Sequence, residues 1–187
     1  MSNITKKALE ASLKHVMLKK PLDKITIRDI TDDCGISRMT FYYHFQDIYA
    51  LIEWICTEDA RLALSDKKSY ANWTEGMQQF FDAVYSNKLF ILNVYHSISR
   101  ERMERFLFQL TYDLIRGVVD EKSAGVVLDE CDKRFIADFY KYSFVGMMLN
   151  WIAQGMDENY GEIVQRISLI MKGGVTSAIE KLANNNK

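Results

Sequence analysis

Residues 26–45 read Thr26-Ile-Arg-Asp-Ile-Thr-Asp-Asp-Cys-Gly-Ile-Ser-Arg-Met-Thr-Phe-Tyr-Tyr-His-Phe45, and this stretch decides the fold. Thr26 followed three residues later by Asp29 has the pattern of a capping box, in which each side chain bonds a free amide at a helix start. Gly35 can end that helix because glycine adopts the left-handed conformation at little cost. Ser37 can then cap a second helix. Two short helices joined at one glycine are typical of a helix-turn-helix, whose second helix enters the DNA major groove.

The second helix of this unit carries more aromatic surface than a solvated helix needs. Phe41 and Phe45 lie four residues apart and should point together into a small core. The other side chains are left to face outward: Arg38, Met39, Thr40, Tyr42, Tyr43 and His44. Such a surface suits contact with a DNA backbone and with base edges. The alternative is that Tyr42, Tyr43 and His44 only pack within the same small domain.

Residues 35–45 resemble the recognition-helix signature of the TetR family of bacterial transcriptional regulators. The resemblance extends over the N-terminal third of the chain, through Leu9, Leu13, Ile25, Thr26, Ile30 and Leu51. It implies binding to double-stranded DNA, with a distinct role for each position. Phosphate contacts are implied for Thr26, Ser37, Thr40, Tyr42 and His44. Contacts with base edges are implied for Arg38, Met39 and Tyr43.

The chain departs from the family pattern just after Phe45. Many members carry lysines at the start of the next helix, close to a DNA phosphate, whereas this chain has Gln46, Asp47 and Ile48. Asp47 is a good N-cap residue. The resemblance therefore does not extend to the phosphate contact that lysine makes there.

Two further stretches, residues 40–55 and 139–156, resemble a subgroup of the family that is associated with dihydroxyacetone kinase operons. Members of this subgroup are similar to repressors in fold, but at least some of them are activators. The resemblance therefore implies a regulator of such an operon, and it leaves both activation and repression open.

The pattern of apolar residues predicts an all-α fold, because helical spacing recurs and no strand-like alternation is long enough to defend. We expect a DNA-binding head at residues 1–46 and a helical regulatory and dimerisation domain at 47–187, which begins with a connecting helix at 47–64. The head should start with a helix at 3–20 that Pro21 ends. The remaining helices are expected at 74–86 (capped by Thr74), 88–97, 99–120, 128–155 and 160–182, with loops at 65–72 and 121–125 and a frayed tail at 184–187.

The last two long helices carry apolar residues on more than one side, and a helix that is apolar on two sides must be buried on both. In residues 128–155 we expect one side to hold Phe135, Phe139, Tyr142, Val145, Met148, Leu149 and Ile152, and another to hold Tyr140, Phe144, Met147 and Trp151. The next helix continues the pattern with Ile163, Ile167, Ile170, Met171 and Val175. The family resemblance implies that two chains pair these helices in a four-helix bundle, so we expect a homodimer. The alternative is a monomer with a large core.

The formal net charge of −1 is not that of a uniformly basic DNA-binding protein. Its distribution is uneven, since residues 1–50 contain eight Lys and Arg against six Asp and Glu, and the remainder contains sixteen against nineteen. A weakly basic head on an acidic body suits a protein that touches DNA with one end only.

The three cysteines, Cys34, Cys56 and Cys131, are odd in number and show no paired spacing. This favours free thiols in a reducing cytoplasm. The N-terminus lacks the apolar segment of a signal peptide, and no run approaches the roughly 18 apolar residues that span a membrane. We therefore expect a cytoplasmic protein with no membrane partner.

Aromatic residues of the body are candidates for an effector pocket, because such residues often line a ligand cavity in proteins similar to this family. The candidates are Phe81, Tyr85, Tyr95, His96, Tyr112, Tyr140 and Trp151. Each of them could equally belong to an ordinary core. The subgroup resemblance also allows a protein co-regulator in place of a small-molecule effector, and the sequence does not decide between them.

The sequence does not indicate enzyme chemistry. His15, His44 and His96 lie far apart without metal-ligand spacing, and no glycine-rich phosphate loop or nucleophile elbow occurs. We therefore expect no catalytic residue, no metal and no cofactor. The rival to a DNA-binding regulator is an all-α ligand carrier or protein-interaction module with a vestigial helix-turn-helix.

Overall fold

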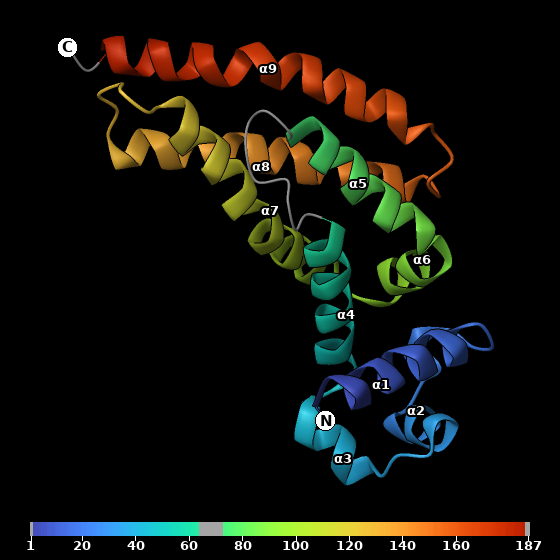
Figure 1. Cartoon of the computed structure of the whole chain (residues 1–187). Helices are drawn as coiled ribbons and strands as arrows, with labels where there is room; N and C mark the ends of the chain where they lie inside the picture. Colours follow the sequence, from blue (N-terminus) through green and yellow to red (C-terminus); the bar gives the residue numbers. More distant parts are fainter. Residues whose placement is uncertain (1, 64–72, 186–187) are drawn as a thin grey trace.

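The computed structural model describes residues 2–63 and 73–185 (Figure 1). Within these ranges the chain forms nine α-helices, one short 3-10 helix and no strand, so the all-α prediction is confirmed. The elements in chain order are α1 (Ser2–Met17), η1 (Leu22–Lys24), α2 (Ile27–Cys34), α3 (Arg38–His44), α4 (Ile48–Ala63), α5 (Trp73–Ser86), α6 (Lys88–Ser97), α7 (Arg100–Lys122), α8 (Glu130–Ala153) and α9 (Tyr160–Asn185).

Helices α1, α2 and α3 pack together as a small N-terminal head, at the lower end of Figure 1. Leu9, Leu13, Ile30 and Phe41 are fully buried in its core. Ser12 of α1 is also buried, and its hydroxyl donates a hydrogen bond of 2.7 Å to the backbone oxygen of Ile30. That bond satisfies a polar group that would otherwise destabilise the core.

Helix α4 joins the head to the body, as Figure 1 shows. The Asp47 carboxylate accepts a hydrogen bond of 2.7 Å from the backbone N–H of Ala50, which confirms the predicted N-cap. Leu51, Ile52 and Ile55 are buried. The connecting helix is therefore packed against its neighbours and does not stand free between head and body.

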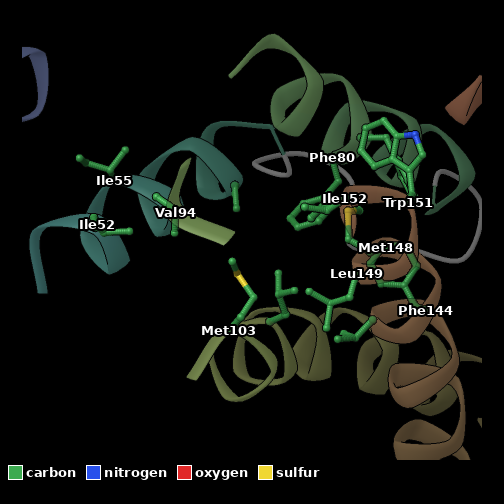
Figure 2. Close-up of a cluster of buried hydrophobic side chains, with 14 of the residues drawn as sticks. Ile52, Ile55, Phe80, Val94, Met103, Phe144, Met148, Leu149, Trp151 and Ile152 are labelled. Carbon is green, nitrogen blue, oxygen red and sulfur yellow. The ribbon is translucent and has the colours of Figure 1, made fainter. Parts of the chain in front are cut away.

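The body consists of α5 to α9, and its core gathers where α4, α5, α7 and α8 meet. Figure 2 shows Met148 and Leu149 of α8 facing Met103 of α7, with Phe80 of α5 beside them. The indole N–H of Trp151 donates a hydrogen bond of 3.0 Å to the backbone oxygen of Glu158. This bond ties the end of α8 to the turn that leads into α9.

The predicted end of the first helix is wrong. Helix α1 ends at Met17 and not at Lys20. The chain leaves the α-helix by a tighter turn, in which the Leu18 N–H bonds the His15 oxygen at 3.2 Å. Pro21 then precedes η1, so the proline follows the helix end at a distance.

The predicted cap of α5 is also wrong. The helix already includes Trp73, so Thr74 lies within it. The Thr74 hydroxyl accepts a hydrogen bond of 3.2 Å from the hydroxyl of Ser168 in α9, which is a tertiary contact and not a cap. The loop predicted at residues 65–72 lies outside the described residues.

The other boundaries in the body differ from the predictions only slightly. Helix α6 occupies the predicted residues 88–97, and α7 continues to Lys122, past the predicted start of the loop. Helix α8 starts after Asp129, whose carboxylate accepts a hydrogen bond of 2.7 Å from an amide in the first turn. Helix α9 continues to Asn185, so the described part of the predicted tail is helical.

The predicted division of α8 into two apolar sides is wrong. Four residues assigned to the side of Phe135, Phe139 and Tyr142 are buried in the chain's own core: Val145, Met148, Leu149 and Ile152. Phe135, Phe139 and Tyr142 are 65%, 58% and 56% exposed. The reason is that α5 and α6 both pack against α8, so apolar residues in its C-terminal part are buried on several sides.

Exposed apolar residues also occur on α9, which packs against α8. Ile170 is 68% exposed, whereas Ile163, Ile167, Met171 and Val175 are buried as expected. We refer to the exposed apolar residues of these two helices collectively as the α8–α9 surface: Phe135, Phe139, Tyr142, Met147, Leu169 and Ile170.

Candidate nucleic-acid interface

The predicted capping box starts α2. The Thr26 hydroxyl accepts a hydrogen bond of 3.2 Å from the Asp29 N–H, and the Asp29 carboxylate accepts one of 2.7 Å from the Thr26 N–H. The Lys20 ammonium lies 2.6 Å from the same carboxylate. The Lys20 bond, followed by those from Thr26, holds the pKa of Asp29 well below its usual range. Thr26 is thereby fixed at the surface of the head.

The turn between α2 and α3 is made by Gly35, with a φ of 69°. This left-handed conformation favours glycine because a side chain would be strained there. The Ser37 hydroxyl caps α3 by accepting a hydrogen bond of 3.1 Å from the Thr40 N–H. The helix-turn-helix predicted from the sequence is therefore formed.

Helix α3 has a buried face and an exposed face. Phe41 is fully buried and Phe45 is 6% exposed, with their ring centroids 6.0 Å apart. Met39 and Tyr43, one turn apart, are 79% and 84% exposed, and Tyr42 is 56% exposed. The two phenylalanines anchor a short helix that presents its remaining side chains to solvent in fixed positions.

The other predicted DNA-contacting residues lie on the same short segment. Arg38 is exposed, whereas Thr40 and His44 are half-buried. The His44 ring lies 5.0 Å from that of Tyr43 in an edge-on arrangement. All the predicted residues except Thr26 therefore belong to α3 or its cap. Because both tyrosines are more than half exposed, internal packing of the head does not account for them.

The body contains two small apolar cavities of about 60 Å³ each. Met77 and Phe144 are among the residues that line the first, and Cys56 and Met148 are among those that line the second. Phe80 lines both of them. Pockets for drug-sized ligands have volumes of about 300–1,000 Å³. Neither cavity is large enough for such a ligand in this conformation.

The seven candidates for an effector pocket do not line either of these cavities. Three of them gather around Tyr160 in an aromatic cluster. The rings of Phe81 and Trp151 lie 5.2 Å apart, and those of Tyr85 and Tyr160 lie 5.3 Å apart. Phe81 and Trp151 are almost fully buried and belong to the core, whereas Tyr85 is 44% exposed.

The other four candidates lie apart from that cluster. Tyr95 and His96 are neighbours on α6, with ring centroids 5.5 Å apart. Tyr112 lines an open polar groove between α7 and α8, and Tyr140 is 8% exposed with its hydroxyl against α9. The structure does not bring the seven together. Phe80 lines both apolar cavities instead, and nothing in the spacing of the sequence distinguishes it from the adjacent Phe81.

In the described part of the chain, no group of three His, Cys, Asp or Glu side chains is placed to hold a metal ion. No helix within residues 2–63 and 73–185 has the length and apolar character needed to cross a membrane.

A helical head with an exposed recognition helix, joined by one helix to an all-α body, defines the class of helix-turn-helix regulators. Residues 11–55 match the family described as bacterial regulatory proteins, tetR family, and residues 71–173 match the transcriptional regulator C-terminal region. The chain belongs to the TetR family and is a transcriptional regulator of that type.

Two relatives show which subgroup of the family the chain resembles. The chain is 25% identical over 166 residues to the HTH-type dhaKLM operon transcriptional activator DhaS of Lactococcus lactis subsp. lactis (strain IL1403), covering 87% of this chain and 88% of the relative. The solved structure of a dihydroxyacetone kinase operon activator DhaS has a similar fold, with a TM-score of 0.73 and 20% identity over 92% of this chain and 96% of that one. The resemblance to this subgroup is confirmed.

Proposed function

We propose that the chain is a homodimeric DNA-binding regulator of a dihydroxyacetone kinase operon, acting in the cytoplasm. The observation that carries the proposal is the exposed face of α3, where Met39 and Tyr43 are 79% and 84% exposed on a helix that Phe41 anchors. Large side chains fixed in this way suit the major groove, where apolar and hydrogen-bonding groups read base edges. The named relatives are activators, which favours activation over repression.

Each residue of the interface has a proposed role. The residues that read base edges are Arg38, Met39 and Tyr43, and a guanidinium in this position can pair with a guanine. Hydroxyl, phenol and imidazole groups around them position the head on the phosphate backbone. The residues with this second role are Thr26, Ser37, Thr40, Tyr42 and His44.

The proposed domain division is a DNA-binding head at residues 1–46 and a regulatory and dimerisation domain at residues 47–187. The α8–α9 surface supports a homodimer, because exposed apolar area of this kind marks interaction sites. Leu169 and Ile170 are 70% and 68% exposed in the single chain. Two heads in such a dimer would occupy successive major grooves of a palindromic operator, about 34–36 Å apart.

The regulatory signal would pass from the body to the head through α4. The Arg102 guanidinium of α7 lies 3.1 Å from the Glu53 carboxylate and 4.5 Å from the centre of the Tyr49 ring. A shift of α7 would therefore move the first turns of α4. The effector is a small molecule or a protein co-regulator. A small molecule that binds in the two apolar cavities would have to enlarge them, whereas a protein co-regulator needs no cavity.

Selection from a pool of random-sequence duplexes tests the proposal. The wild-type chain should enrich a palindrome with half-sites about one helical turn apart. That sequence should occur beside dihydroxyacetone kinase genes in the genome that encodes the chain. Failure to enrich any sequence would instead favour the rival, an all-α ligand carrier or interaction module with a vestigial helix-turn-helix.

A further inference from the structure

Most cations of the head are engaged by neighbouring acids. Within residues 2–50, ion pairs of 2.6 to 3.8 Å involve Lys7, Lys14, Lys20, Lys24 and Arg28. The head has three other lysine and arginine side chains, and none forms an ion pair with a described carboxylate: Lys6, Lys19 and Arg38. Arg38 belongs to the recognition helix, so Lys6 and Lys19 are the head's remaining lysines without such an ion pair.

Lys6 is held in place by aromatic rings. It lies on the same side of α1 as the buried Leu9 and Leu13, so its stem continues the apolar side of the helix. Its ammonium lies 5.5 Å from the centre of the Phe45 ring and 5.5 Å from that of Trp54. A cation over aromatic faces is attracted to them. The side chain is half-buried, so part of it is exposed to solvent.

This position is the corner between the recognition helix and α4. Phe45 is the C-cap of α3, and Asp47 caps α4 two residues later. The intervening sequence, Gln46, Asp47 and Ile48, carries no positive charge. A helix in the major groove has a phosphate backbone on either side, and contacts to these phosphates fix its register. The Lys6 ammonium therefore places a positive charge beside the C-terminal end of the recognition helix, where residues 46–48 have none.

We propose that Lys6 contacts a DNA phosphate at the C-terminal end of the recognition helix. The inference rests on the proposed DNA-binding function and adds a residue to its interface. The rings of Phe45 and Trp54 already order the ammonium in the free protein, so the contact requires little further ordering on binding. Lys6 positions the head on the duplex and reads no base.

The salt dependence of DNA binding tests this role. Each neutralised phosphate changes the slope of log K against log salt by about 0.9, so two Lys6 residues in a dimer contribute about 1.8.

Lys6→Met keeps an apolar stem over the rings and removes the charge. On a duplex that the wild type selects from the random pool, Lys6→Met should bind more weakly and flatten the slope by about 1.8, whereas Lys6→Arg should keep the slope. Lys181→Gln, an exposed residue of α9, controls for net charge and should change neither.

A second variant tests the location. Gln46→Lys in the Lys6→Met background returns a positive charge to the same corner and should restore the slope; no restoration would overturn the assigned position. A Lys6→Met variant with the wild-type slope would overturn the inference. A loss of affinity that is equal at every salt concentration would also overturn it, because it would show that the Lys6 side chain acts only by packing in the head. If the wild type itself selects no duplex, the proposed function fails instead.

Discussion

Asn93 of α6 accepts a hydrogen bond of 3.0 Å from the backbone N–H of Leu22, at the start of η1 in the head. The same side chain donates a longer bond, of 3.5 Å, to the backbone oxygen of Met17 at the end of α1. Lys14 of α1 adds a contact at 5.5 Å from the centre of the Phe90 ring. The body therefore holds the head through α6 as well as through α4, so a movement of α6 would reach the head directly.

Asn93→Ala should lower the free energy of unfolding by about 1 kcal/mol, the usual net contribution of one hydrogen bond. The reason is that the N–H of the buried Leu22 would lose its acceptor. Urea unfolding measures the change. Asn93→Asp is the matched control, because it keeps an oxygen acceptor at the same position and should retain most of the stability. Equal stability of Asn93→Ala and the wild type would show that this bond contributes nothing.

The capping box should make stability depend on pH. The pKa of Asp29 is lowered first by the hydrogen bond from Lys20 and then by those from Thr26. A carboxyl with a lowered folded-state pKa stabilises the protein above its unfolded pKa, about 3.9, and this stabilisation is lost as the pH falls toward the folded value. Asp29→Asn should therefore be less stable than the wild type at neutral pH, with a deficit that shrinks below about pH 4. Urea unfolding at several pH values checks this, and a deficit independent of pH would contradict it.

Phe139→Glu should convert the proposed dimer into a monomer. The side chain is 58% exposed on the α8–α9 surface, and a carboxylate buried there between two chains would lack a partner. Sedimentation velocity at micromolar concentration measures the mass in solution. Val127→Glu is the control, because Val127 is 92% exposed in the loop before α8 and lies outside that surface. A Phe139→Glu variant that remains dimeric would place the interface elsewhere.

The three cysteines should differ in reactivity. Burial raises the pKa of the Cys56 thiol to about 12, whereas Cys131 is exposed. The Cys34 thiol donates a hydrogen bond of 3.1 Å to the Ile30 oxygen. Because the thiolate is the reacting form, an aromatic disulfide reagent at pH 8 should label one thiol per chain quickly. Cys131→Ser should abolish that fast phase and Cys56→Ser should preserve it. A fast phase that survives Cys131→Ser would show that a second thiol is accessible.

Features that depend on neighbouring residues could be predicted from the sequence. The capping box of Thr26 and Asp29, the turn at Gly35 and the cap at Ser37 each involve contacts within a few residues, so the pattern determines them. The same holds for the burial of Phe41, because helical spacing decides which face of a short helix is apolar. These local signals were enough to locate the helix-turn-helix and its exposed face.

Features that depend on distant partners could not be predicted in this way. Thr74 has the residue type of a cap, but it bonds Ser168 of α9. Phe80 lines two cavities although its neighbour Phe81 does not, and only the packing of six helices distinguishes the two residues. Lys6 reaches the end of the recognition helix because α1 passes beside it. Nothing in the sequence around Phe45 indicates that contact.

Tyr43→Ala should weaken specific DNA binding by about 1–3 kcal/mol if Tyr43 reads a base. Its stability should stay within about 0.5 kcal/mol of the wild type, because the side chain is 84% exposed. Phe41→Ala is the contrasting variant, since loss of this fully buried ring should lower stability by about 3–5 kcal/mol. Fluorescence anisotropy and urea unfolding separate the two effects. Unchanged operator affinity would remove Tyr43 from the base-reading residues.

The most direct test of the central claim is an anisotropy titration with the DNA that flanks the gene, at low and at physiological salt. An unrelated duplex serves as competitor. A sequence-reading dimer should bind tightly, lose affinity steeply as salt rises, and keep its binding when the competitor is in excess. Weak binding that the competitor abolishes, with equal affinity for both duplexes, would contradict the assignment of α3 as a helix that reads DNA sequence.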